Sequence, residues 1–108
     1  MDKDKELINP VKYLKQKLLT EMGLPIAEVA RALNLSYVSA SKIFNGHSNI
    51  TVATALRMET VFGIPAEELM KIQWAWTFEE EKNTFLKSKE FKKLKKFEKN
   101  ELSIKKLI

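Results

Sequence analysis

Small polar side chains gather on one face of a short helix predicted near the middle of this sequence. They lie in the stretch LNLSYVSASKIFNG, residues 33–46, where Ser39, Ser41 and Asn45 share the face with one charged residue, Lys42. The base-pair edges in the major groove of double-stranded DNA carry hydrogen-bond donors and acceptors that a helix can reach. The pattern therefore predicts a helix that reads DNA, although a solvated surface helix has the same residue types.

Other exposed positions extend this predicted surface toward the start of the helix. The hydroxyl groups of Ser39 and Ser41 can bind almost any base, and Lys42 can reach a guanine or a phosphate. Tyr37 and Val38 occupy the first turn, where Val38 can contact the methyl group of thymine. Together with Asn45, these residues form the candidate base-reading face.

Turn and cap residues indicate how this helix is positioned. Asn34 is one of the few non-glycine residues that tolerates a left-handed backbone, so a sharp turn can precede the helix. Ser36 is a favourable N-cap, and Asn45-Gly46 ends the helix. The side chains expected to point inward are Ala40, Ile43 and Phe44. Two short helices joined by a tight turn, the second capped by serine, are typical of a helix-turn-helix.

Helical patterns also cover the sequence before this turn, and no segment shows the sustained alternation of a strand. Asn9 is suited to cap a first helix with Pro10 at its first position, and Gly23 to end it. Apolar residues recur at helical spacing along this first helix: Val11, Leu14, Leu18 and Met22. Pro25 begins a second short helix, whose predicted buried side is formed by Ile26, Val29, Ala30 and Leu33.

Two more helices and a C-terminal extension follow the Ser-rich helix. Thr51 caps a fourth helix that ends at Gly63, and Pro65 begins a fifth that continues to Trp76. Four apolar residues after Thr77 have the spacing of one more amphipathic helix: Phe85, Phe91, Leu94 and Phe97. The sequence therefore predicts an all-α protein of five helices with an extra C-terminal amphipathic helix. Its predicted parts are a flexible N-terminus (1–8), a helix-turn-helix domain (9–76) and a Lys/Glu-rich helical extension (77–108).

The positive charge is concentrated in the C-terminal extension. The chain has a formal net charge of +5, yet residues 23–76 carry four basic and four acidic residues and are neutral. Residues 77–108 carry ten Lys and six Glu, a net charge of +4. Since phosphate neutralisation supplies much of DNA affinity, the neutral centre favours modest binding. The lysines on one side of the extension, Lys92, Lys93, Lys95, Lys96 and Lys99, either bind DNA phosphates or only keep the surface soluble.

The sequence gives no support for catalysis or for a metal or cofactor site. Cysteine is absent and His47 is the only imidazole, so the sequence offers no Ser-His-Asp set with a plausible base and no second His or Cys to complete a metal site. The run Glu79-Glu80-Glu81 diverges by about 100° per residue on a helix, which indicates a solvated surface. No apolar run approaches the roughly 18 residues of a membrane span. We therefore expect a cytoplasmic protein that is not an enzyme, with no cofactor and no membrane partner.

Residues 9–73 resemble the lambda-repressor-like (XRE) helix-turn-helix family, and most of all its HigA-type antitoxin branch. The matching motifs are Asn9-Pro10, Glu28-Val29-Ala30 with Leu33, Leu35-Ser36, Ser41-Lys42-Ile43-Phe44-Asn45-Gly46, Ile50-Thr51, Ala55-Leu56-Arg57 and Phe62-Gly63. Pro25 and Ile26 depart from the family, which usually has Ser or Thr and then a phosphate-binding Gln there. Tyr37 follows Ser36 where Gln is common, and Asn34 replaces the usual Gly of the turn.

The resemblance implies a lambda-repressor-like fold and a DNA-binding site that continues beyond the recognition helix. His47 and Ser48 stand where the family's next loop contacts phosphates, although simple exposure to solvent is the usual state of a lone loop histidine. The complete predicted DNA-binding set is Ser36, Tyr37, Val38, Ser39, Ser41, Lys42, Asn45, His47 and Ser48.

The resemblance further implies a homodimer that binds a palindromic operator, because such repressors place two recognition helices one DNA turn apart. The predicted dimer interface contains Trp74, Phe78 and Phe85, since the aromatic residues of this region exceed what a small core can bury. The implied function is that of a repressor of its own operon that also neutralises a small RelE-like ribonuclease toxin. Two alternatives stay open: a regulator of the XRE family without a toxin, and an interaction module that no longer binds DNA.

Overall fold

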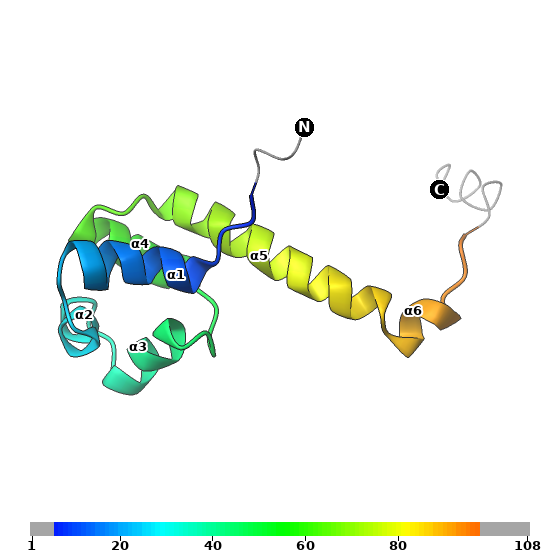
Figure 1. Cartoon of the computed structure of the whole chain (residues 1–108), viewed down its shortest axis with the longest axis horizontal. Helices are drawn as coiled ribbons and strands as arrows, with labels where there is room; N and C mark the ends of the chain where they lie inside the picture. Colours follow the sequence, from blue (N-terminus) through cyan, green and yellow to red (C-terminus); the bar gives the residue numbers. More distant parts are fainter. Residues whose placement is uncertain (1–5, 98–108) are drawn as a thin grey trace, which may run out of the picture.

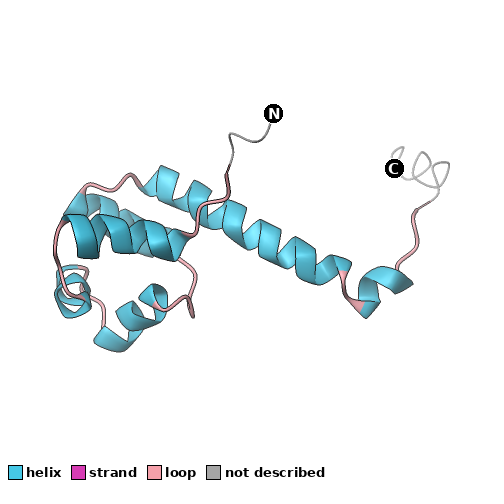
Figure 2. Cartoon of the chain, viewed as in Figure 1, coloured by secondary structure: helices cyan, strands magenta, loops and turns pink. Residues whose placement is uncertain are grey.

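The computed structural model describes residues 6–97, and the regular structure in this range is helical (Figures 1 and 2). The elements in chain order are α1 (Pro10–Leu14), the π-helical segment η2 (Lys15–Glu21), α2 (Ile26–Ala32), α3 (Tyr37–Phe44), α4 (Val52–Phe62), α5 (Ala66–Leu86) and α6 (Lys89–Lys93). The predicted all-α fold is confirmed. The predictions for residues 1–5 and 98–108, including Lys99, lie outside the described residues.

The first helix begins and ends where local sequence chemistry predicts. The Asn9 side chain accepts hydrogen bonds from the backbone amides of Val11 (2.9 Å) and Lys12 (3.3 Å), and Pro10 occupies the first helical position. α1 continues directly into η2, and the chain leaves this helix at Gly23, whose φ of +68° few other residues tolerate. Met22 lies past the last helical turn and is 47% exposed, so it does not belong to the predicted buried stripe.

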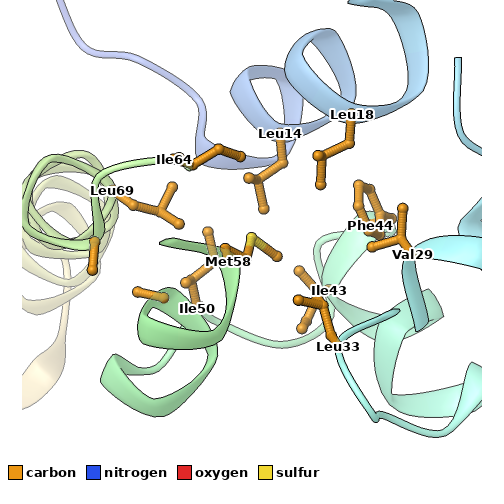
Figure 3. Packing of buried hydrophobic residues seen from close by; sticks show 12 residues of the cluster. Leu14, Leu18, Val29, Leu33, Ile43, Phe44, Ile50, Met58, Ile64 and Leu69 are labelled. Atoms are coloured by element: carbon orange, nitrogen blue, oxygen red, sulfur yellow. The ribbon is translucent and has the colours of Figure 1, made fainter. Parts of the chain in front are cut away.

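One apolar core joins the helices α1 to α5 (Figure 3). Its largest fully buried side chains are Phe44, Leu14, Leu18, Met58, Leu69 and Val29. The inner side of α3 is formed by Ala40, Ile43 and Phe44 as predicted, whereas Ile26 of α2 is only half-buried. Each large side chain removed from water contributes about 1.5–3 kcal/mol, so this shared core determines how α3 is presented.

α5 is longer than the sequence pattern suggests. It runs without interruption from Ala66 to Leu86, so the predicted start of a separate helix at Thr77 is wrong. A second short helix, α6, follows a break at Lys87-Ser88, and the backbone is extended at Leu94 (φ −74°, ψ 142°). No proline or glycine lies between Trp76 and the break, which allows one continuous helix.

The second half of α5 extends away from the helical core (Figure 1). The Cα radius of gyration is 19.1 Å, whereas a compact domain of this length has about 13 Å. The extended part of the chain is therefore a projecting arm, and its side chains are available to other molecules.

Candidate nucleic-acid interface

A residue with a left-handed backbone conformation forms the turn between α2 and α3. Asn34 has a φ of +57°, as its residue type predicts. The Leu35 amide donates to the Ala30 carbonyl oxygen at 2.9 Å, and the Asn34 amide donates to that of Arg31 at 3.1 Å. These bonds satisfy carbonyl groups at the end of α2 and fix the angle at which α3 leaves the turn.

Arg57 of α4 braces the same turn from outside the two helices. Its Nη1 atom donates to the carbonyl oxygens of Leu33 at 2.9 Å and Asn34 at 3.2 Å. Sequence reasoning assigned Arg57 no structural role, although the resemblance included it. No acidic residue stands three or four positions from it, so it has no ion-pair partner on its own helix. That absence is the only local indication of its role.

The outer face of α3 presents most of the predicted base-reading residues to solvent. Tyr37 is 58% exposed and Val38 is 62% exposed, while Ser39, Lys42 and Asn45 are also exposed. The buried side of α3 lies against the core, so this outer face is free to approach a ligand. An α-helix fits the width of the major groove, and an exposed face of hydrogen-bonding and apolar groups can contact the base edges there.

Two serines of the predicted set form hydrogen bonds that hold the helix. Ser36 caps α3, because its Oγ accepts from the Ser39 amide at 3.0 Å and donates to Ser39 Oγ at 3.0 Å. Ser41 is half-buried rather than fully exposed, and its Oγ accepts from Asn45 Nδ2 at 3.1 Å. These contacts orient Ser39 and Asn45, so Ser36 and Ser41 support the exposed face.

The loop after α3 is folded back on the helix. Gly46 has a φ of +78°, and the amides of His47 and Ser48 both donate to the Lys42 carbonyl oxygen, at 2.8 and 3.2 Å. His47 is exposed and Ser48 is half-buried. The predicted loop residues therefore lie directly beside the C-terminal end of the predicted base-reading face.

Gln73 of α5 anchors the far end of this loop. It is the buried polar residue of the described core, with 5% of its surface exposed. Its Oε1 accepts from the Ile50 amide at 2.9 Å, and its Nε2 donates to Thr77 Oγ1 at 2.8 Å and to Asn49 Oδ1 at 3.4 Å. Sequence reasoning missed this residue, because its partners in the loop are 23 and 24 residues away.

A polar cleft separates α3 from the start of α4. It is lined by Leu35, Ser39, Lys42, Ile43, Ser48, Asn49, Thr51 and Thr54. Thr51 caps α4, as predicted, by accepting from the Thr54 amide at 3.2 Å. Hydroxyl and amide groups beside one lysine and a helix N-terminus are suited to a phosphate oxygen.

The aromatic residues of α5 form an exposed pair on the same helix as Gln73. Trp74 is 65% exposed and Phe78 is 49% exposed, and their rings are stacked with centroids 5.1 Å apart. The Lys82 Nζ lies 5.6 Å from the Phe78 ring centroid. Phe85 is 41% exposed and contacts Phe91 edge to face. Trp76 is half-buried and lines a cleft with Pro10 and Val11 at the start of α1, so the core takes up only part of this aromatic set.

Neither metal-binding nor membrane-spanning features occur in the part of the chain that the structure describes. Within residues 6–97, no group of three or more His, Asp or Glu side chains is arranged to hold a metal ion. Over the same residues, no helix combines the length and apolar character needed to cross a bilayer. Of the glutamate run, Glu79 pairs with Lys82 at 3.2 Å.

Comparison with known sequences identifies the matched region. The model of the helix-turn-helix family matches residues 14–69. The uncharacterised HTH-type transcriptional regulator YddM of Escherichia coli (strain K12) is 28% identical over 69 residues, which are 64% of this chain and 73% of that protein. Virulence-associated protein I of Dichelobacter nodosus is 33% identical over 69 residues, 64% of each chain. The match therefore covers slightly less than two thirds of the second relative.

Solved structures share the fold over most of this chain. The antitoxin GraA has a TM-score of 0.73 at 20% identity, covering 85% of this chain and 98% of that one. An addiction module antidote protein of a HigA family from Coxiella burnetii has a TM-score of 0.70 at 25% identity, covering 85% and 99%. PA4674 of Pseudomonas aeruginosa, solved with its operator DNA, has a TM-score of 0.70 at 23% identity, covering 85% and 100%.

Proposed function

This chain belongs to the helix-turn-helix family of DNA-binding regulators, and we propose that it is a sequence-specific repressor that places α3 in the major groove of its operator. The observation that carries this proposal is the exposed outer face of α3, where Tyr37, Val38, Ser39, Lys42 and Asn45 are accessible while the opposite side is buried. A gel shift with the DNA upstream of the gene tests it. Failure of the folded protein to bind this DNA would contradict it.

The residues around α3 divide between base contacts and phosphate contacts. The exposed α3 residues reach base edges, where Lys42 suits guanine and Asn45 suits adenine. His47 and Ser48 bind the sugar-phosphate backbone together with the polar cleft at the start of α4. Ser36 and Ser41 act on DNA through the side chains that they orient.

We further propose that the repressor is a homodimer and that its operator is palindromic. The stacked pair of Trp74 and Phe78 places exposed aromatic surface on α5, and Phe85 follows about two helical turns later. Large aromatic side chains are enriched at protein–protein interfaces, where their burial contributes most of the binding energy. A two-fold axis through this surface would present two copies of α3 to one duplex.

The finer function that we propose is that of an antitoxin, which represses its own operon and neutralises a RelE-like ribonuclease encoded beside it. The similarity to the HigA-family antidote protein of Coxiella burnetii supports this proposal. Co-expression with the adjacent reading frame, followed by pull-down, tests it separately from DNA binding. A protein that binds its operator but no product of a neighbouring gene would instead be a regulator of the XRE family without a toxin.

One structural feature favours an interaction module without DNA binding as the second candidate. α2 begins at Ile26 with Pro25 at the cap position and no side-chain cap, so its start lacks the polar groups that bind phosphate in relatives. This face of the molecule would then contribute little to DNA affinity. The gel shift with the upstream DNA separates this candidate from both regulators.

A further inference from the structure

Hydrogen bonds and a ring contact hold the bend between α5 and α6. Ser88 Oγ donates to the Phe85 carbonyl oxygen at 2.6 Å and accepts from the Phe91 amide at 3.0 Å, which caps α6. The Phe85 and Phe91 rings meet edge to face with centroids 5.3 Å apart. These contacts, with the Leu94 amide donating to the Glu90 carbonyl oxygen at 3.1 Å, give residues 85–94 a defined shape at the end of the projecting arm. We call residues 85–97 the basic elbow.

The basic elbow holds the densest positive charge of the described chain. Six lysines and one acid, Glu90, give it a net charge of +5 over 13 residues. The lysines are Lys87, Lys89, Lys92, Lys93, Lys95 and Lys96. All six are exposed, and none forms an ion pair with a residue in the described range 6–97. Such an uncompensated patch attracts a polyanion.

The remainder of the candidate DNA surface lacks this charge. Residues 36–48 contain one lysine, Lys42, and no other basic or acidic residue apart from His47. Phosphate contacts supply most of the non-specific affinity of DNA-binding proteins, so a groove-reading helix with one cation needs additional contacts. Among residues 6–97, the basic elbow is the strongest source of such contacts.

The arm carries the basic elbow away from the core and toward the side on which α3 lies. In Figure 1, α5 runs obliquely from the side opposite α3, and α6 lies on the same lower side as α3. The part of α5 that leaves the core, residues 77–86, has 10 residues and spans about 15 Å. The elbow is therefore displaced from the core by roughly half a turn of duplex DNA.

We propose that the basic elbow is a second DNA-binding site, which contacts the phosphates of the duplex flanking the sequence read by α3. This inference rests on the proposed function. The ligand is the phosphodiester backbone, so the contact is independent of base sequence and extends the length of DNA that the protein occupies. Phe85 and Phe91 shape the elbow, and its lysines bind.

The test measures the affinity for an operator duplex with and without flanking DNA. Wild-type protein is expected to bind an operator of about 40 base pairs more tightly than the same operator trimmed to about 20. The variant Lys92→Gln/Lys93→Gln should lose this gain, on the order of tenfold at 0.15 M salt, and its salt dependence should weaken by about two phosphate contacts. The control variant Lys15→Gln/Lys71→Gln removes the same charge from exposed positions outside the elbow and should retain the gain.

Several outcomes would overturn the proposal. One is an equal gain from flanking DNA in wild type and in the elbow variant. Another is binding of the elbow lysines to phosphatidylglycerol vesicles while the dependence on flanking DNA is unchanged, which would assign the patch to lipid. A folded wild-type protein that binds neither duplex would contradict the proposed function itself. Operator binding that does not depend on duplex length would contradict the proposed role of the basic elbow and leave the proposed function standing.

Discussion

The guanidinium group of Arg57 lies 2.9 Å from the carbonyl oxygen of Leu33, the residue at the end of α2. This contact, with a second one to the Asn34 carbonyl oxygen at 3.2 Å, ties α4 to the turn of the helix-turn-helix. The angle between α2 and α3 therefore depends on a third helix, which also contributes Met58 to the core. The position of α3 is therefore a property of the whole domain.

Replacing Arg57 with leucine should destabilise the domain by about 1 kcal/mol, since two carbonyl groups lose a charged donor while water can partly replace it. Urea unfolding followed by circular dichroism measures this change. Arg31→Leu is the matched control, because Arg31 pairs only with Glu28 on an exposed surface and should cost less than about 0.5 kcal/mol. Equal losses of stability for the two variants would contradict a bracing role for Arg57.

Gln73→Leu should destabilise the domain by about 1–3 kcal/mol, because the buried amide of Ile50 loses its acceptor. The same change should weaken operator binding, since the loop that carries His47 and Ser48 loses its anchor. Hydrogen exchange locates the effect. The Ile50 amide should exchange faster in the variant than in the wild type, and this increase should be larger than that of the core amides of α3. Gln16→Leu, at an exposed position, is the control and should leave Ile50 protected. Unchanged exchange at Ile50 would contradict the anchoring contact.

The features that the sequence predicts correctly depend on residues within one helical turn of each other. Asn9, Ser36 and Thr51 each cap a helix through a hydrogen bond to an amide two or three residues away. Gly63 ends α4 with a φ of +76°. Such short-range contacts are specified by local residue type and spacing, so the helix starts and the turn at Asn34 could be predicted.

The features that could not be predicted depend on distant residues or on a change of composition. The partners of Arg57 and the loop partners of Gln73 are 23 or 24 residues away along the chain, and neither side chain has a local pattern that indicates them. The change to charged residues after Trp76 resembles an element boundary. This change of composition instead marks the point where α5 leaves the core. Beyond that point the helix can continue, because an apolar face is no longer required for packing against the other helices of the core.

Lys42→Ala and Asn45→Ala should each weaken operator binding by about 1–3 kcal/mol, the range for loss of one base-edge contact. Fluorescence anisotropy with a labelled operator measures the loss of affinity. For Asn45→Ala, the affinity for unrelated DNA should fall less than the affinity for the operator. Lys15→Ala is a control with the same loss of charge at an exposed position outside the interface. If both α3 variants bind the operator as tightly as wild type, α3 is not the reading helix.

Trp74→Lys and Phe78→Lys should convert the proposed dimer to a monomer with little change in the stability of the domain, because both rings are largely exposed within one chain. Burial of large aromatic side chains typically supplies at least 2 kcal/mol each at an interface centre, so the dimer dissociation constant should rise by more than tenfold. Sedimentation equilibrium measures the association state, and thermal unfolding checks that the variants remain folded. Val61→Lys, which adds the same charge at an exposed apolar position of α4, should leave the dimer intact. Dimers of equal strength in all three variants would place the two-fold interface elsewhere, and the distance between the two recognition helices would then be set by another surface.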